Sequence, residues 1–434
     1  MNWKEDYRRK VSKPTEAIKA IHDGQCVVMG HAAAAPRLIQ QALADHCEDY
    51  NDVLIFHMTT LGDNPCYKPR CFGHFRHVSN FLSANSREVI ERREGDFFPA
   101  YFKDVPSMIG SDIPCDVAVF QVTPPNAEGY CSLGVSCDYA KAAIHAAKTV
   151  IVETNELMPF TYGDTMVHVS QVDYIIPCAY HLQELHLPAP GSVELAIGHN
   201  CASLVADGST LQLGIGAIPD AVLQSLADKN DLGIHSEMFS GGVMELMKSG
   251  VINGRRKTLH RGKAVVTFIM GPRELYDFVD ENPDVEFHPV DYVNNPLVIA
   301  KNDRMISINS CLEVDLQGQV SSETIGMRQY SGIGGQVDFI RGASLAREGK
   351  AIIAMRSTAA GGKISRIKPF LTPGAAVSTS RNDVDYIVTE YGVARLKGRT
   401  LQHRAEDLIR IAHPDFRPQL AEEYERRFHC KYQD

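Results

Sequence analysis

The sequence predicts an α/β protein of two domains, each built on a largely parallel sheet. The chain has 434 residues, more than one compact hydrophobic core usually contains. Short β-branched runs alternate with helix-length amphipathic segments, which is the pattern of successive βαβ units. A stretch with two prolines and a glycine, Leu185–Ser192, interrupts this alternation, which then restarts.

The first half supplies several strand-length runs, each followed by turn residues and a helical stretch. The clearest are Cys26–Met29, Val53–His57, Val117–Val122 and Thr149–Val152. Because domain boundaries favour segments rich in Pro and Gly, the interruption predicts domains over residues 1–187 and 188–434.

The second half contains three predicted strand–turn–helix units. They are Thr210–Leu213 with Gly214–Gly216 and Pro219–Ala227, Leu232–His235 with Ser236–Glu237 and Gly242–Lys248, and Lys263–Met270 with Gly271–Pro272 and Arg273–Val279. In open parallel sheets, ligands bind outside the carboxyl ends of the strands. The three turns are therefore expected to share one rim, and Glu237 lies where chemistry is expected.

Glu237 stands in the segment GIHSEMFSGG. A carboxylate at a strand end beside glycines has room for a substrate and nearby backbone N–H groups that can hold a developing oxyanion. A single glutamate after a strand is, however, most often solvated or caps a helix. The residue alone therefore does not establish catalysis.

Composition argues against several classes of partner. The formal charge of −9 comes without a concentrated basic face, which argues against nucleic-acid binding. The apolar runs are strand-length, and the polar start of the chain differs from a signal peptide, so we expect neither a membrane span nor secretion. The 11 cysteines are scattered without a CxxC pair, which indicates reduced thiols and a cytoplasmic location.

Three glycine-rich turns are candidates for ligand loops. GIGAIP (Gly214–Pro219) and SGIGGQVDF (Ser331–Phe339) place glycine where a backbone approaches a ligand or turns sharply, but neither completes a dinucleotide fingerprint. STAAGGKISRIKPF (Ser357–Phe370) combines glycine with Lys363, Arg366 and Lys368. This third turn is either a phosphate-facing patch or a solvated basic loop.

Four histidines admit simpler explanations than catalysis. His74 and His77 have HxxH spacing without an acidic ligand nearby, so we do not expect a metal site. His31 is a rim residue or a turn histidine. His235 points to the same strand face as Glu237, and a buried core position is its simplest role.

Long ordered motifs span nearly the whole chain, and together they carry a family resemblance. They are Thr123–Tyr139, Tyr162–Ser170, Gly208–Leu223, Gly233–Met238, Ser331–Ala343, Ala375–Gly398 and Ile411–Arg417. With these motifs the chain resembles the acetyl-CoA hydrolase/transferase family of class I CoA-transferases. The resemblance is greatest to members that act on 4-hydroxybutyrate or that exchange CoA between butyryl-CoA and acetate. It implies two CoA-transferase-type α/β domains with the active site at their interface.

The resemblance implies roles for particular residues. Glu237 matches the family's nucleophile, and Asn294 matches its mobile active-site asparagine, although Asn295 stands beside it. Gly334 and Gly335 match the segment whose backbone N–H forms the oxyanion hole and contacts CoA, with Gly335 as the implied catalytic position. The implied CoA-binding positions are Gly214, Ile215, Gly216, Ala217, Gly332, Gly334, Gly335 and Lys363.

One departure from the family concerns Ala360, which stands where relatives often carry lysine in STAKGGK. If that lysine contacts the nucleotide phosphate in relatives, Lys363 or Arg366 must replace it here, or CoA binding is weaker.

The implied activity is CoA exchange between an acyl-CoA and a small carboxylate, in ping-pong fashion through a glutamyl-CoA thioester. The implied substrates are four-carbon acids with acetate as partner, and His31, Asn126 or a tyrosine could meet a terminal hydroxyl. CoA thioesters serve as substrates, with no tightly bound cofactor and no metal. The resemblance also implies a homodimer or a dimer of dimers, and the composition argues against nucleic-acid and membrane partners.

Three other functions fit parts of the sequence. An acyl-CoA hydrolase on the same scaffold differs only in letting water resolve the intermediate. A nicotinamide-dependent oxidoreductase is disfavoured by the failed glycine fingerprint. A non-catalytic CoA-binding protein leaves Glu237 unexplained.

Overall fold

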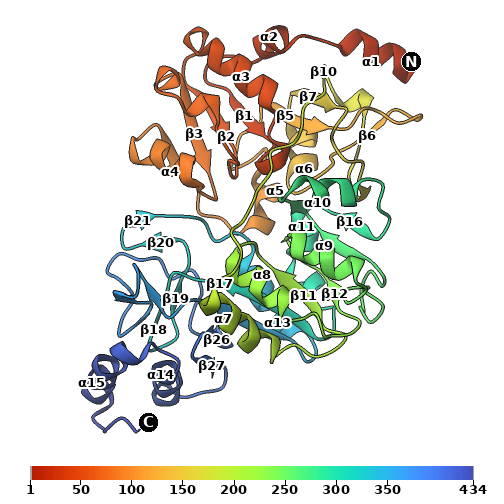
Figure 1. Cartoon of the computed structure of the whole chain (residues 1–434). Coiled ribbons are helices and arrows are strands. Elements are labelled where there is room, and N and C mark those ends of the chain that lie inside the picture. Colours follow the sequence, from red (N-terminus) through yellow and green to blue (C-terminus); the bar gives the residue numbers. More distant parts are fainter. Residues whose placement is uncertain (1, 434) are drawn as a thin grey trace. The chain divides into compact units, whose positions relative to one another are not determined.

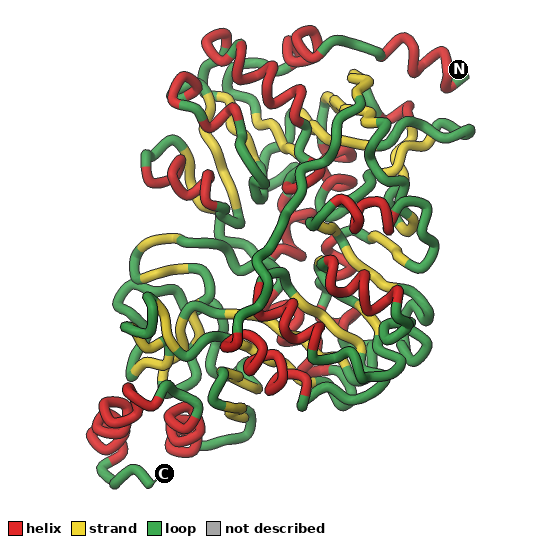
Figure 2. The backbone as a smooth tube through the Cα atoms, in the orientation of Figure 1, coloured by secondary structure: helices red, strands yellow, loops and turns green. Residues whose placement is uncertain are grey.

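The computed structural model describes residues 2–433, which form two compact units. Unit 1 contains the chain up to His186 together with Val265–Val293, and unit 2 contains Leu187–Ala264 and the chain from Asn294 onward. Residues 179–191, which follow the last strand of the first sheet, contain neither helix nor strand and appear in Figure 2 as a long green stretch. Among the described residues, no helix is long and apolar enough to cross a membrane.

Unit 1 is organised around a seven-stranded sheet in the order β10-β7-β5-β1-β2-β3-β4 (Figure 1). All its neighbouring strands are parallel. The central strands are buried along nearly their whole length, as expected for a parallel sheet covered on both faces. The strands are β1 (Cys26–Met29), β2 (Val53–Phe56), β3 (Phe75–Ser79), β4 (Gly95–Phe97), β5 (Val117–Val122), β7 (Thr149–Asn155) and β10 (Tyr174–Cys178).

Helices and short strands complete unit 1. The helices are α1 (Trp3–Lys10), α2 (Pro14–Ala17), α3 (Arg37–Asp45), α4 (Ala84–Glu91), α5 (Val105–Met108), α6 (Ala140–Ala146), α10 (Arg273–Val279) and α11 (Val290–Val293). The short strands are β6 (Tyr130–Ser132), β8 (Tyr162–Gly163), β9 (Met166–His168), β15 (Phe268–Ile269) and β16 (Val285–Phe287). Strand β14 (Ala264–Val266) joins β16 and β8 in a three-stranded sheet.

Unit 2 is organised around a six-stranded sheet in the order β12-β11-β17-β22-β26-β27. Its pairs are parallel except β26 with β27. The strands are β11 (Thr210–Leu213), β12 (Gly233–Ile234), β17 (Met305–Ser310), β22 (Lys350–Ala354), β26 (Tyr386–Thr389) and β27 (Gly392–Arg395). From β11 the chain passes to β12 on one side and later to β17 on the other, so the carboxyl ends of β11 and β17 form a topological switch point.

Seven helices of unit 2 lie within the described residues. They are α7 (Ser192–Ala202), α8 (Ala217–Gln224), α9 (Gly241–Lys248), α12 (Pro296–Ile299), α13 (Gln336–Leu345), α14 (Leu401–Arg410) and α15 (Arg417–Phe428). Helix α13 packs against β17 and β22, and α8 packs against α7 and α9. The short strands are β13 (Met238–Phe239), β18 (Glu313–Asp315), β19 (Val320–Ser321), β20 (Thr324–Ile325), β21 (Arg328–Gln329), β23 (Thr358–Ala359), β24 (Ile364–Ser365) and β25 (Ile367–Lys368).

The α/β class with largely parallel sheets is confirmed, and several predicted bounds agree with the structure. The strand Thr210–Leu213 and the helix Arg273–Val279 occur as predicted. The helix predicted from Pro219 begins two residues earlier, at Ala217. The division at residue 187 stays a prediction about domains; the compact units differ from it because Val265–Val293 lies with the first.

The prediction of one strand over Lys263–Met270 was wrong. The chain bends at Thr267, whose carbonyl accepts a hydrogen bond from the Cys137 backbone N–H at 2.9 Å. This bend separates β14 from β15, and neither belongs to the six-stranded sheet. Gly271–Pro272 therefore does not lie on the rim of that sheet, contrary to expectation.

Candidate active site

Glu237 follows β12 and is held at the carboxyl edge of the six-stranded sheet. The preceding residue, Ser236, donates its hydroxyl to the Leu213 carbonyl at 3.1 Å. Leu213 is the last residue of β11, so this hydrogen bond extends the pairing of β11 and β12 beyond the regular strand. The Glu237 side chain is partly buried there.

Asn294 contacts the Glu237 carboxylate directly. Its Nδ2 donates to Glu237 Oε2 at 2.6 Å, and the Asn294 side chain is fully buried. Asn294 Oδ1 has no hydrogen-bond partner among the described residues. The neighbouring Asn295 has a different role, because its side chain caps α12 by accepting from the Leu297 N–H at 2.9 Å.

Gly335 is the third residue at the Glu237 carboxylate. It is the N-cap of α13, and it follows Gly334, whose φ of +52° lies in the left-handed region. A Cβ placed on Gly335 would overlap Glu237 Oε2 and Asn294 Nδ2. The backbone therefore reaches the carboxylate only because this position has no side chain. The amino end of a helix also favours a negative charge.

The turn after β11 leaves open space. A Cβ on Gly214 or Gly216 would meet no atom within 4 Å. Gly216 has φ +124° and ψ 177°, a conformation essentially restricted to glycine, and α8 begins at the next residue, Ala217. Ile215 and Ala217 are partly buried. These residues therefore lie at the same sheet edge as Glu237, with room for a ligand beside them.

The basic loop predicted from the sequence is only partly available for a phosphate. Lys363 is exposed on the turn between β23 and β24. Gly332, another predicted CoA contact, belongs to a different loop, the one before α13, and is buried there. Lys368 instead pairs with Glu313, with Nζ and Oε2 separated by 2.6 Å. Ala360 adopts φ +51°, so the departure from the family pattern stands in a left-handed turn.

The other histidines have structural partners. His235 is buried, and its ring lies 6.3 Å from that of Phe339 on α13. His74 Nδ1 and His77 Nε2 contact different backbone carbonyls, those of Tyr50 and Cys66.

His31 and Asn126, the two residues predicted to meet a substrate hydroxyl, have hydrogen-bond partners within the protein. His31 is fully buried with Nε2 3.0 Å from Asp138 Oδ2, and Ser136 bonds the same carboxylate oxygen. Asn126 Oδ1 accepts from the Glu128 and Tyr130 N–H groups and so closes its own turn.

Two buried histidines of unit 1 have strongly altered acidity. Burial, together with the nearby His31 and His77, lowers the pKa of His57 to about 3. Burial likewise lowers the pKa of His77 to about 4. Both imidazoles are therefore neutral in the folded protein near neutral pH.

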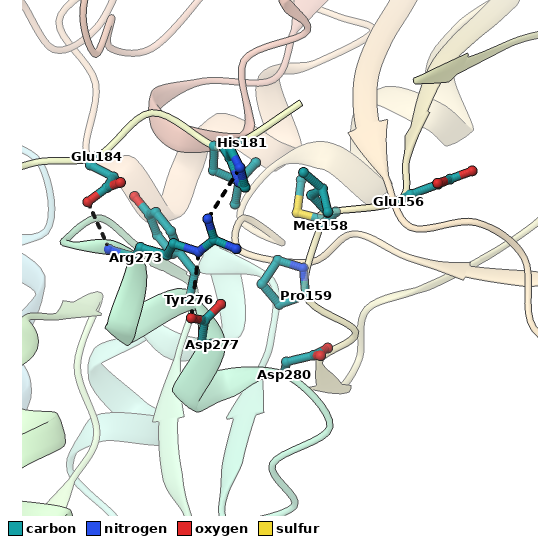
Figure 3. A pocket seen from close by; sticks show the side chains of 11 residues that line it. Glu156, Met158, Pro159, His181, Glu184, Arg273, Tyr276, Asp277 and Asp280 are labelled. Atoms are coloured by element: carbon teal, nitrogen blue, oxygen red, sulfur yellow. Dashed lines mark hydrogen bonds and ion pairs between the residues drawn. The ribbon is translucent and has the colours of Figure 1, made fainter. Parts of the chain in front are cut away.

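Unit 1 also contains a cleft of about 170 Å³, shown in Figure 3. The Arg273 guanidinium points to His181 Nε2 at 3.2 Å and to Asp277 at 3.7 Å, while the Arg273 N–H donates to Glu184 at 3.0 Å. The Arg273 guanidinium therefore already has partners within the cleft. None of the predicted site residues lines this cleft.

Comparison with known proteins identifies two family domains in the chain. The acetyl-CoA hydrolase/transferase N-terminal domain matches residues 1–178, and the C-terminal domain of the same name matches residues 271–424. The 4-hydroxybutyrate coenzyme A transferase of Clostridium kluyveri is 55% identical over 99% of this chain and 100% of its own length. The succinyl-CoA:cyclohexane-1-carboxylate CoA transferase of Geobacter metallireducens is 45% identical over 97% of this chain and 96% of its own.

A solved structure agrees with these matches. The 4-hydroxybutyrate CoA-transferase of Porphyromonas gingivalis superimposes with a TM-score of 0.86, at 48% identity, over 98% of this chain and 100% of that one. Hydrolases are more distant: an acetyl-CoA hydrolase of Candida albicans is 30% identical over 51% of this chain and 42% of its own.

The buried histidines predict how stability depends on pH. In the unfolded chain His57 has an ordinary pKa near 6.5, so its imidazole is protonated below that pH. In the folded chain the same imidazole stays neutral until the pH falls to about 3. Within this window, each such histidine should lower the free energy of unfolding by roughly 1.4 kcal/mol for every unit by which the pH falls. His57→Gln should therefore lose stability less steeply than the wild type between pH 6 and 5 in urea unfolding.

The exposed variant His22→Gln is the control, and it should follow the wild-type slope. Equal slopes for the wild type and His57→Gln would contradict the assignment of a neutral, buried His57.

Proposed function

This chain belongs to the acetyl-CoA hydrolase/transferase family, and we propose that it exchanges coenzyme A between a short-chain acyl-CoA and a carboxylic acid. The reaction proposed is that of 4-hydroxybutyrate with acetyl-CoA, giving 4-hydroxybutyryl-CoA and acetate. The whole-length similarity to 4-hydroxybutyrate CoA-transferases supports this substrate pair. Butyryl-CoA with acetate is the alternative pair, since a butyryl-CoA:acetate CoA-transferase of Anaerostipes caccae is 35% identical over 98% of the chain.

One contact supports the proposed chemistry above all others. Glu237 Oε2 lies 2.6 Å from Asn294 Nδ2, with Gly335 packed against both and open space at Gly214. A carboxylate at a sheet's ligand edge with a polar donor and an open approach suits a nucleophile.

In the first half-reaction the Glu237 carboxylate attacks the acyl-CoA carbonyl, and the C–S bond breaks to give an acyl–glutamyl anhydride and CoA thiolate. The thiolate then attacks the glutamyl carbonyl, which releases the first acid and leaves a glutamyl-CoA thioester. An acceptor carboxylate reverses these steps. The anhydride preserves the energy of the thioester, which a serine ester would dissipate.

Asn294 and Gly335 have defined parts in this proposal. The Asn294 amide orients the carboxylate before attack and can donate to the oxygen that gains charge in the tetrahedral intermediates. Gly335 brings the amino end of α13 to the same oxygen. Gly214–Ala217, Gly332, Gly334 and Lys363 are proposed CoA contacts, while the homodimer and the cytoplasmic location stay predictions.

Glu237→Gln should abolish exchange, because a neutral amide of the same size cannot attack the thioester. We expect the rate of acetyl-CoA formation from 4-hydroxybutyryl-CoA and acetate to fall by at least about 10³-fold. Glu245→Gln, an exposed residue on α9, is the matched control and should retain activity. Activity of Glu237→Gln close to the wild-type rate would refute the proposed nucleophile.

The same assay separates transfer from hydrolysis. A transferase should form acetyl-CoA in proportion to added acetate and release little free CoA. A hydrolase would release CoA at the same rate with and without acetate, and that result would overturn the proposed transfer.

Gly335→Ala should impair catalysis more than folding. The added methyl group would overlap the Glu237 carboxylate and the Asn294 amide, so one of them must move. We expect kcat to fall by at least about tenfold, since small displacements of reacting groups are costly. Ser344→Ala, on the same helix, is the control and should keep its kcat. A Gly335→Ala protein that folds normally and turns over at the wild-type rate would contradict this role of Gly335.

A further inference from the structure

Two side-chain amides bond reciprocally at the switch point of unit 2. Gln212 Nε2 on β11 donates to Asn309 Oδ1 on β17 at 3.2 Å, and Asn309 Nδ2 donates back to Gln212 Oε1 at 3.1 Å. Each residue stands one position before the end of its strand. Gln212 is buried with 4% of its surface exposed, while Asn309 is partly buried.

This amide pair lies on the sheet face that His235 shares and that α13 covers, since the His235 ring lies 6.3 Å from that of Phe339; the amino end of the same helix contacts Glu237. Thr210 pairs with Gly233, and a Cβ on Gly233 would lie 3.5 Å from Thr210 Oγ1, so both positions share a face. Gln212 and His235 each stand two residues further along and therefore share that face as well. Two residues beyond these, Gly214 lies level with Glu237.

The position beside Asn309 and above Gln212 is open. Gly214 has no side chain, and a Cβ there would meet no atom within 4 Å. Leu213 pairs with Ile308, so the next residues, Gly214 and Asn309, are level with one another (Figure 1 shows β11, β12 and β17). Asn309 therefore borders the open position, and Gln212 lies one layer below it.

The pair retains the capacity to bind an anion. A primary amide has two N–H donors, and each amide uses one of them on its partner. The second N–H of Asn309 lies on the more exposed member of the pair. A neutral donor pair at the switch point of a parallel sheet suits a carboxylate, which accepts hydrogen bonds and carries no donor when ionised.

We propose that the Gln212–Asn309 amide pair borders a carboxylate-binding position beside Glu237, with Asn309 at its side and Gln212 below it. This inference rests on the proposed CoA transfer. There, one oxygen of the acceptor carboxylate accepts the amide N–H, and the other attacks the glutamyl carbonyl of the enzyme–CoA thioester. The C–S bond breaks, CoA thiolate leaves, and a mixed anhydride forms. The thiolate then attacks the acceptor's carbonyl and restores the Glu237 carboxylate.

Asn309→Asp tests this role with minimal change of shape. The aspartate still accepts the Gln212 Nε2 hydrogen bond, but it loses the donor and adds a negative charge beside the acceptor. The enzyme–CoA thioester is formed with acyl-CoA and freed of the released acid by gel filtration. Acetate is then added, and acetyl-CoA formation is followed against acetate concentration.

We expect the second-order rate constant for acetate to fall by at least about tenfold in Asn309→Asp. Formation of the enzyme–CoA thioester should stay within a few-fold of the wild type. The free enzyme already carries the negative charge of Glu237, so the added charge raises the free energy of that state and of the anionic transition state alike, whereas the thioester enzyme is neutral at this position. Gln212→Glu, which still accepts from Asn309 Nδ2, is a second variant with the same expected pattern. A purely structural pair would instead change both half-reactions equally.

Thr210→Val is the matched control, since it alters a buried position on the same strand and face without reaching the open position. It should leave the acetate dependence unchanged. If both Asn309→Asp and Gln212→Glu show the wild-type dependence on acetate, the proposed carboxylate-binding role is wrong, while the proposed CoA transfer still stands. Absence of the enzyme–CoA thioester in the wild type would overturn the proposed function and, with it, the inference.

Discussion

The hydrogen bond between Asn294 Nδ2 and Glu237 Oε2 is the interaction on which the proposed site depends. At 2.6 Å it joins residues separated by 57 positions in the chain, and it is short enough to fix the orientation of the carboxylate. Gly335 packs against the same two atoms. Because a Cβ there would overlap both groups, the contact requires glycine at this position of α13.

The parallel sheet explains why these residues meet. Strand β12 brings Glu237 to the carboxyl edge, and Ser236 anchors it to the end of β11. The return of the chain to β17 places Asn309 beside Gln212 at the switch point. Helix α13, which packs on β17 and β22, then brings its amino end to the carboxylate. The proposed chemistry thus uses strand ends and one helix end of a single compact unit.

Local patterns predicted the class of fold well because strands and helices have distinct periodicities. The strand Thr210–Leu213 and the helix Arg273–Val279 are examples. The bend at Thr267 was missed because a backbone hydrogen bond to Cys137, 130 positions away, determines it. The local sequence around residue 267 contains no information about a contact with so distant a residue.

In the candidate site, too, contacts between residues distant in sequence could not be predicted from local patterns. Glu237 and the glycine turns carried a recognisable signal, whereas Asn294 and Asn295 could not be separated by sequence. The structure separates them, since Asn295 caps α12 and Asn294 reaches Glu237. The Gln212–Asn309 pair gave no signal, because two ordinary amides 97 positions apart become a feature only when β11 and β17 pair.

The most direct test of the account is to trap the enzyme-bound intermediate. The protein is incubated with acyl-CoA, reduced with borohydride and digested, and its peptides are then measured by mass spectrometry. The account predicts reduction at Glu237 that requires acyl-CoA and that disappears when excess acetate is added before borohydride. An unmodified Glu237 peptide from protein that actively exchanges CoA would contradict the account.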